Sequence, residues 1–390
     1  MITACQACGS SRLERFYETP SIPVHSCLMV RDRDQALRFP RGDLALAVCH
    51  ECGFIQNVLF DPRVHSYSPD YEETQGFSPR FRAFQTELCR DQAERHALRG
   101  KTVLEIGCGK GEFLVELCRL ADCRGIGIDP SYRPERTAIE DRERVRFVQD
   151  FYSERTKDLS ADYVCCRHTL EHIGPVREFV GMIRGTLEGR SETVFFLEVP
   201  DVERVLKERA FWDIYYEHCS YFTLGSLARL FRRVGFDPTR LWKGFDDQYL
   251  LIEARPGDGR GGERFAAEDD LARTLAEVRS FRAGIAEHFT RLRAELARLR
   301  RKGRVVLWGS GSKAVSYLNT LGIQDELEYV IDINPHKHGK FLAGTGHEIA
   351  SPEFLRTYRP ASVIVMNPIY VPEIRSQLEQ MGLAPEVTAV

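Results

Sequence analysis

The sequence predicts an α/β protein in which two doubly wound domains follow a small cysteine-containing module. Three observations support this fold class. A buried strand, a glycine turn and an amphipathic helix follow one another from residue 101, and a second series of this kind begins at residue 304. Two CxxC pairs precede both series. A chain of 390 residues is long enough for two or three domains.

The composition excludes several classes of partner. A formal net charge of −3 gives no basic excess for nucleic acid or an anionic membrane. No apolar run approaches the roughly 18 residues of a membrane span, and the N-terminus lacks the features of a signal peptide. We therefore expect a cytoplasmic protein, a monomer or a homodimer, with a small-molecule substrate.

Changes in composition divide the chain into five predicted segments. The expected boundaries are 1–60 for a zinc-binding module, 61–98 for a helical and aromatic linker that contributes to the substrate pocket, 99–255 for the first doubly wound domain, 256–302 for a connecting helix, and 303–390 for the second.

Two cysteine pairs of identical spacing predict a metal site. Cys5 and Cys8 form one CxxC pair, Cys49 and Cys52 form the other, and a glycine follows each pair. This spacing lets two thiolates reach one tetrahedral ion, and four thiolates leave no open position for catalysis. We expect a structural Zn²⁺, with a redox or free-thiol role as the alternative. The gap between the pairs is longer than in the usual zinc ribbon.

The first glycine turn has the composition of a cofactor loop. Gly107, Gly109 and Gly111 follow a strand and open a helix, so the backbone can approach a ligand closely. A dinucleotide site is the first alternative, and it is disfavoured because Glu105, the acid at the strand end, precedes the glycines. Asp129 ends the next strand and can accept hydrogen bonds from both hydroxyls of a ribose. A loop that serves only as a tight turn is the remaining alternative.

These residues resemble the class I S-adenosylmethionine-dependent methyltransferases, and the resemblance covers residues 101 to about 255. It implies a Rossmann-like domain that binds S-adenosylmethionine, with Asp150 and Phe151 near the adenine at the end of the third strand. In many such enzymes the segment after the fourth strand, here with His168 and His172, borders the methionine part of the cofactor.

Two Glu-His pairs are candidate proton-handling groups. Glu171 and His172 either shape the cofactor pocket or take part in catalysis, and the sequence leaves both roles open. Glu217 and His218 lie in the aromatic stretch WDIYYEHCSYFT, whose rings would exclude water. Such a pair can move one proton at neutral pH, and a buried structural pair is the alternative.

Over nearly its whole length the chain resembles the zinc-containing sugar C-methyltransferases, which act on nucleotide-linked 4-keto-deoxysugars. The resemblance rests on the four cysteines, the methyltransferase segment, YEHCSYFT and the second glycine turn, in that order. It implies that Glu217 and His218 lie beside the carbon that is methylated. It also implies that Tyr67 and Tyr71 belong to a segment that closes the pocket. Residues 73–75, Glu-Thr-Gln, depart from the serine-rich run of that family.

The expected chemistry explains these residue types. Carbon has no lone pair, so C-methylation requires removal of a proton beside a carbonyl group and stabilisation of the enolate oxygen. We expect His218 to remove the proton, Glu217 to orient His218, and the hydroxyl of Tyr71 or Tyr221 to donate to the enolate.

The second glycine turn predicts an anion-binding site. Backbone amides and one ammonium group at a strand-to-helix turn can bind a phosphate. We assign Ser310, Ser312, Lys313 and Asn334 to binding of a nucleotide sugar. Asp332 departs from what the resemblance implies for deoxythymidine sugars, and a domain used only for packing or dimerisation is the alternative.

The sequence therefore predicts an S-adenosylmethionine-dependent enzyme that methylates a carbon of a nucleotide-linked keto-deoxysugar. The enzymatic alternative is an O- or N-methyltransferase for another small metabolite, in which His218 is a simple base. The non-enzymatic alternative is a zinc-dependent, cofactor-binding scaffold protein.

Overall fold

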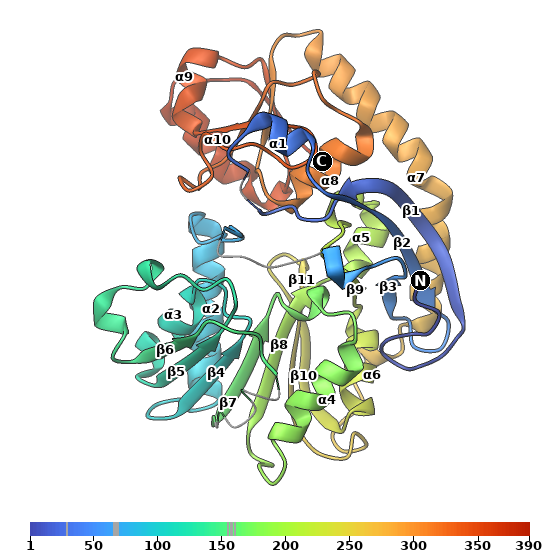
Figure 1. Cartoon of the computed structure of the whole chain (residues 1–390), viewed down its shortest axis with the longest axis vertical. Helices are drawn as coiled ribbons and strands as arrows, with labels where there is room; N and C mark the ends of the chain where they lie inside the picture. Colours follow the sequence, from blue (N-terminus) through green and yellow to red (C-terminus); the bar gives the residue numbers. More distant parts are fainter. Residues whose placement is uncertain (29, 65–69, 154–155, 157–158, 160) are drawn as a thin grey trace.

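The computed structural model describes residues 1–28, 30–64, 70–153, 156, 159 and 161–390, and these residues contain three β-sheets (Figure 1). The central sheet and the C-terminal sheet are flanked by helices, so the predicted α/β class is confirmed. Among the described residues, no helix combines the length and the apolarity needed to cross a membrane.

The central sheet has seven strands in the order β10-β11-β8-β7-β4-β5-β6. Strands β4 to β8 are parallel, and β11 and β10 add two antiparallel strands at one edge. Strand β5 lies on one side of β4, whereas β7, which comes later in the chain, lies on the other side of β4. The carboxyl ends of β4 and β7 therefore flank a topological switch point, where ligands bind in such sheets. The strands are β4 (Thr102–Ile106), β5 (Arg124–Ile128), β6 (Val145–Val148), β7 (Tyr163–Arg167), β8 (Val194–Pro200), β10 (Phe236–Gly244) and β11 (Tyr249–Pro256).

Amphipathic helices alternate with these strands. Helix α3 begins after Gly111, whose φ of 83° lies in the left-handed region that favours glycine, and it buries Phe113, Leu114 and Leu117 on one face. Helix α2 is capped by Ser78 and has proline at its first position. The helices are α2 (Pro79–Arg95), α3 (Glu112–Ala121), α4 (Val176–Thr186), α5 (Val202–Glu208) and α6 (Leu224–Arg233).

The N-terminal sheet is antiparallel and takes its fourth strand from the aromatic segment near residue 220. Strands β1 (Leu13–Pro23), β2 (Arg41–Cys49) and β3 (Ile55–Asn57) are joined by β9 (Ser220–Tyr221). Ile55 pairs with Tyr221 and Gln56 with Ser220. The segment that carries Glu217 and His218 is thus hydrogen-bonded to the N-terminal sheet.

The connection between β1 and β2 crosses to the C-terminal domain. Val30 forms a bridge with Phe341, and the amide of Gly344 donates to the carbonyl of Ala36 in the short helix α1 (Arg33–Leu37) at 2.8 Å. Figure 1 shows α1 among the C-terminal helices. This excursion explains why the two CxxC pairs lie farther apart than in a compact zinc ribbon.

The C-terminal sheet is parallel, in the order β14-β13-β12-β15-β16. A long helix, α7 (Leu271–Arg300), precedes it and packs against α5 and β1. The elements are β12 (Val305–Trp308), α8 (Ser312–Leu321), β13 (Tyr329–Ile331), β14 (Glu348–Ala350), α9 (Leu355–Tyr358), β15 (Ser362–Val365), α10 (Val371–Gln380) and β16 (Glu386–Ala389).

Short 3₁₀ turns connect many of these elements. They are η1 (Pro62–Val64), η2 (Pro134–Arg136), η3 (Ile139–Asp141), η4 (Leu170–His172), η5 (Phe211–Asp213), η6 (Ala266–Glu268), η7 (Pro352–Phe354) and η8 (Pro368–Tyr370).

The close packing of the N-terminal sheet against the aromatic segment can be tested at Gly42. A methyl group at Gly42 would lie 2.5 Å from Cε2 of Tyr216, so Gly42→Ala should destabilise the fold by about 1–3 kcal/mol and lower the midpoint of thermal unfolding. Gly181→Ala in α4 is the matched control, because its methyl group meets nothing within 4 Å. Equal unfolding midpoints for the two variants would contradict this packing.

Candidate active site

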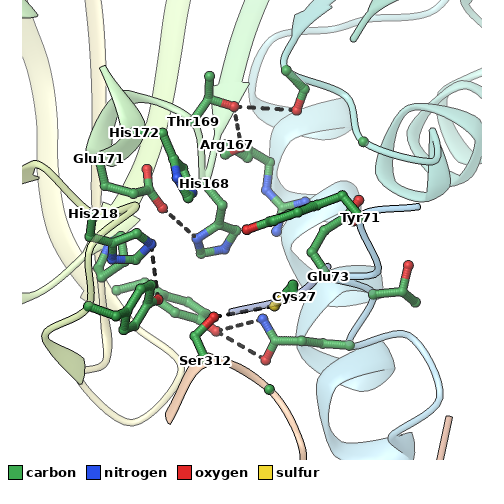
Figure 2. Close-up of a pocket in the computed structure, with 18 of the residues that line it drawn as sticks. Cys27, Tyr71, Glu73, Arg167, His168, Thr169, Glu171, His172, His218 and Ser312 are labelled. Carbon is green, nitrogen blue, oxygen red and sulfur yellow. Dashed lines mark hydrogen bonds and ion pairs between the residues drawn. The ribbon is translucent and has the colours of Figure 1, made fainter. Parts of the chain in front are cut away.

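A cavity of about 1190 Å³ lies at the carboxyl ends of the central strands (Figure 2). Its walls include the glycine loop after β4, the segments that follow β5, β6, β7 and β8, the loop that precedes α2, the aromatic segment of residues 213–221, and the C-terminal domain around Ser312. Two glycine turns far apart in the sequence therefore open into the same space.

The first glycine loop is held close to the residues after β7. Gly107 has φ of 70°, and a Cβ atom there would lie 1.9 Å from Oγ1 of Thr169. Glu105 is buried beneath the loop, and its Oε2 atom has no hydrogen-bond partner in the described part of the chain. Burial raises the pKa of Glu105 to about 8. A buried acceptor that lines a cavity is an available hydrogen-bond partner for a ligand.

Asp129 fixes the loop from the neighbouring strand end. Its Oδ2 atom accepts from the amide of Gly109 at 2.8 Å, and its Oδ1 atom accepts from the amide and hydroxyl of Ser131, both at 2.7 Å. A carboxylate has about four lone-pair sites, so about one remains for a ligand. Asp150 and Phe151 also line the cavity, and Phe151 is an exposed apolar side chain.

His168 lies between two carboxylates. Its Nε2 atom is 3.3 Å from Oε1 of Glu198, and its Nδ1 atom is 3.6 Å from Oε1 of Glu171. Burial opposes the charged imidazole, but the two carboxylates outweigh burial and raise the pKa of His168 to about 9. His168 is therefore a cation at neutral pH in the cavity wall.

The structure brings the two Glu-His pairs together. The rings of His172 and His218 lie edge to face, with centroids 4.7 Å apart. The ligating atoms of Glu171, His172 and His218 all lie within 4.8 Å of one another, so this cluster has the composition of a metal site as well as of a proton-transfer site. The sequence carries no sign that the two pairs meet, because 44 residues separate His172 from Glu217.

His218 is a neutral base with a phenol beside it. Burial and the neighbouring His172 lower the pKa of His218 well below its usual value. The hydroxyl of Tyr215 lies 3.0 Å from Nε2 of His218, and both residues line the cavity. Tyr215 was not among the predicted catalytic residues. The sequence signal that could have identified it is its position three residues before His218, in an apolar run.

Glu217 points away from the cavity. Its side chain is fully buried, and it is absent from the described residues that line the cavity. Oε1 accepts from the amide of Ser26 at 2.7 Å and from the Ser26 hydroxyl, while Oε2 lies 3.3 Å from Nδ1 of His25. The sequence predicts that Glu217 orients His218, and the contacts with Ser26 and His25 attach Glu217 to the N-terminal module.

The predicted tyrosines have different positions. Tyr71 lines the cavity and forms a backbone bridge with Leu28. Tyr221 also lines the cavity, and its hydroxyl lies 3.4 Å from the carbonyl of Tyr215. Tyr67 lies outside the described residues. Glu73, another cavity residue that was not predicted, is 3.7 Å from Lys110, and burial raises its pKa to about 7.

The C-terminal turn presents part of its predicted site to the cavity. Ser312, Lys313 and Asn334 line the cavity, whereas Ser310 is buried and bonds through its amide and hydroxyl to Asp332. All three cavity-lining groups also have internal partners: the Ser312 hydroxyl lies 2.7 Å from that of Ser26, Lys313 forms an ion pair with Asp213, and the Asn334 amide donates to Glu72 at 3.0 Å.

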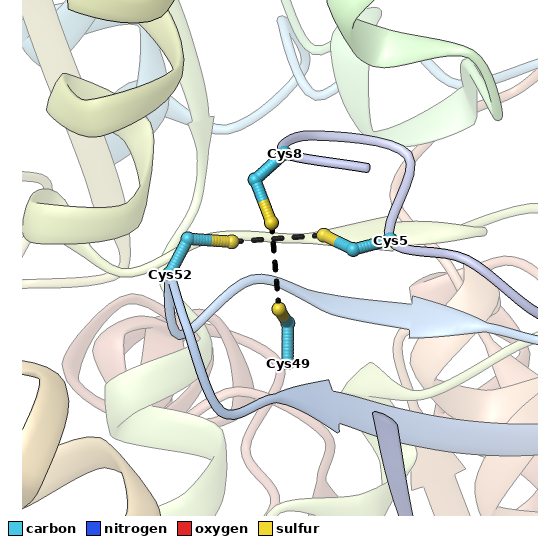
Figure 3. Close-up of side chains that lie close together, drawn as sticks. All are labelled: Cys5, Cys8, Cys49 and Cys52. Carbon is cyan, nitrogen blue, oxygen red and sulfur yellow. Dashed lines mark hydrogen bonds between the residues drawn. The ribbon is translucent and has the colours of Figure 1, made fainter. Parts of the chain in front are cut away.

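Four thiols converge in the N-terminal module (Figure 3). The Sγ atoms of Cys5 and Cys52, and those of Cys8 and Cys49, are each 3.6 Å apart. Tetrahedral thiolates at the usual Zn–S length lie about 3.8 Å from one another, so the four positions fit a zinc ion.

Comparisons with known proteins agree with this geometry. Residues 80–241 match the family model described as a methyltransferase domain, and residues 262–384 match the model described as a C-methyltransferase C-terminal domain. The chain is 27% identical over 406 residues to C-methyltransferase NovU of Streptomyces niveus, which covers 96% of this chain and 91% of that protein. It is 32% identical over 102 residues to the ribosomal protein L11 methyltransferase of Edwardsiella ictaluri, which covers 25% of this chain and 34% of that one.

Among solved structures, the 1,6-didemethyltoxoflavin-N1-methyltransferase of Burkholderia thailandensis is 22% identical and covers 45% of this chain and 79% of its own, with a TM-score of 0.35. The two family models and the relative of nearly equal length decide the assignment. The chain is an S-adenosylmethionine-dependent methyltransferase that is similar over nearly its whole length to a C-methyltransferase.

Proposed function

We propose that the enzyme methylates a carbon next to the ketone of a nucleotide-linked keto-deoxysugar. One observation carries the proposal: a neutral buried base, His218, and the hydroxyl of Tyr215 face a cavity that also receives the cofactor loop. A base paired with a hydrogen-bond donor is what enolate formation requires.

The residues of the glycine loop suit S-adenosylmethionine. The unpartnered Oε2 of Glu105 and the remaining acceptor site of Asp129 offer oxygens to the amino and hydroxyl groups of this cofactor. Asp150 and the exposed ring of Phe151 offer a polar and an apolar contact for adenine. When bound, the cofactor supplies an electrophilic methyl group.

His218 removes the proton in this mechanism. Its low pKa keeps the ring unprotonated, so a nitrogen lone pair is available at neutral pH. The proton moves from the substrate carbon to His218, and the electron pair of the broken C–H bond moves toward the carbonyl oxygen. The cationic ring of His168 nearby disfavours a second positive charge on His218, which promotes return of the proton to solvent.

Tyr215 is the donor best placed for the enolate oxygen. Its hydroxyl contacts the ring that receives the proton, so protonated His218 strengthens Tyr215 as a donor. The surrounding rings of Tyr71 and Tyr221 exclude water, which protects the carbanion from reprotonation.

The C-terminal turn is the proposed site for the nucleotide part of the substrate. Gly311 lines the cavity, and a Cβ atom there would meet nothing within 4 Å, so space is open beside this residue at the start of α8. Because Lys313 is already paired with Asp213, a diphosphate would be bound mainly by amides and the Ser312 hydroxyl. The four cysteines are the proposed zinc site, with a structural role.

The cofactor site can be tested at Gly107. Gly107→Ala places a methyl group against Thr169 at a left-handed φ, so we expect at least a tenfold loss of S-adenosylhomocysteine affinity by calorimetry. Gly185→Ala in α4 has no neighbour within 4 Å and should bind as wild type. Unchanged affinity in Gly107→Ala would remove this loop from the cofactor site.

The base can be tested by comparing the two histidines. His218→Ala should retain S-adenosylhomocysteine binding and lose turnover of a nucleotide-linked 4-keto-deoxysugar by roughly 10²–10⁴-fold. The turnover of Glu217→Gln should fall between that of wild type and that of His218→Ala.

His172→Ala removes a group that lowers the pKa of His218, so the acid limb of kcat against pH should move to higher pH while turnover persists. Normal turnover in His218→Ala together with an inactive His172→Ala that still binds cofactor would make His172 the base.

Metal analysis tests the cysteine cluster. We expect about one zinc per chain, and Cys5→Ser or Cys52→Ser should lower soluble yield because ligation is coupled to folding. Absence of zinc from native protein would contradict the site. A second equivalent that disappears in His172→Ala would assign a metal to the histidine cluster and contradict its role as a free base.

A further inference from the structure

We propose that Ser26 of the N-terminal module is a positioning residue for the catalytic segment, and that it acts through Glu217. The proposal rests on the proposed function, in which His218 and Tyr215 handle the proton. Ser26 joins three parts of the chain: the N-terminal module, the segment of residues 215–218 and the C-terminal glycine turn.

The first support is the burial of the Glu217 carboxylate. A fully buried charge requires hydrogen-bond donors, because desolvation of an unpaired carboxylate costs several kcal/mol. Ser26 supplies two of them, its amide at 2.7 Å and its hydroxyl, and the His25 ring lies 3.3 Å from the other oxygen. Ser26 and His25 are themselves buried, so water does not readily replace them.

The second support is the direction of the side chains around the turn. The amide of His218 bonds to the carbonyl of Tyr215 at 3.2 Å, which closes a turn with Glu217 inside it. Tyr215 and His218 face the cavity, whereas Glu217 faces the N-terminal module. The contact with Ser26 thus fixes the turn that carries both proton-handling groups, on the side of the turn that faces away from the cavity. Misplacement of such groups by about 1 Å can cost 10²-fold in rate.

The third support is the contact of Ser26 with the substrate side. The Ser26 hydroxyl lies 2.7 Å from the hydroxyl of Ser312, which lines the cavity at the start of α8. The thiol of Cys27 lies 3.3 Å from the same Ser312 oxygen. A ligand group that bonds to Ser312 would therefore be connected to Ser26 through the Ser312 hydroxyl, and to Glu217 through the hydroxyls of Ser312 and Ser26. Through this series of contacts, substrate bound at the C-terminal turn can influence the position of His218.

A double-mutant cycle tests whether Ser26 acts through Glu217. Ser26→Ala should lower kcat for a nucleotide-linked 4-keto-deoxysugar by about 10–100-fold, with S-adenosylhomocysteine affinity and zinc content unchanged. In the Glu217→Gln background, Ser26→Ala should change kcat less than twofold, because the group it positions is already altered. Ser26→Thr keeps the hydroxyl and should retain most of the activity. Ser11→Ala, at an exposed serine of the same module, is the control.

Hydrogen–deuterium exchange gives a readout that needs no substrate. The peptide of residues 212–222 should exchange faster in Ser26→Ala than in wild type or Ser11→Ala. Unchanged exchange, or kcat losses that add fully in the double variant, would overturn the positioning role. Failure of wild-type protein to methylate the sugar while exchange responds as expected would instead contradict the proposed function.

Discussion

The segment from Trp212 to Phe222 has to satisfy its backbone in one sheet while it presents side chains to the cavity of another domain. It does so through β9, whose residues pair with β3 of the N-terminal sheet. Cys219 is the central link: its amide donates to the carbonyl of Glu171 at 2.9 Å, and its carbonyl accepts from the amide of Asn57 at 2.9 Å. The upstream Glu-His pair, the catalytic segment and the N-terminal sheet are therefore connected by backbone hydrogen bonds.

This arrangement connects the four-cysteine cluster to the segment that carries His218. Cys49 ends β2 and Cys52 precedes β3, so an ion held by the four thiols would fix the turn between the two strands that support β9. A metal with no open coordination position cannot take part in methyl transfer, but it can order the sheet that supports the segment carrying His218. The buried Glu217 adds a second attachment through Ser26.

The fold class and the glycine turn after β4 could be predicted because their signals are local. The glycines after β4, the acids at the strand ends and the CxxC pairs each lie within a few residues of the structure they define. The meeting of His172 with His218 could not be predicted, since it depends on the pairing of β9 with a sheet formed by residues 13–57. The partners of Glu217 and Lys313 were missed for the same reason: Ser26 and Asp213 lie in other domains. In the sequence, the side chains of Glu217 and Lys313 look available to a ligand, whereas in the fold both are paired with other residues.

The proposed mechanism depends on one step, the formation of an enolate before methyl transfer. The most direct measurement is uptake of solvent deuterium by a nucleotide-linked 4-keto-deoxysugar in D₂O, with S-adenosylhomocysteine in place of the methyl donor. We expect deuterium at the carbon next to the ketone, observed by NMR or mass spectrometry, because His218 can remove that proton without methylation. Absence of deuterium at that carbon, for a compound that the enzyme methylates on oxygen or nitrogen, would contradict this mechanism.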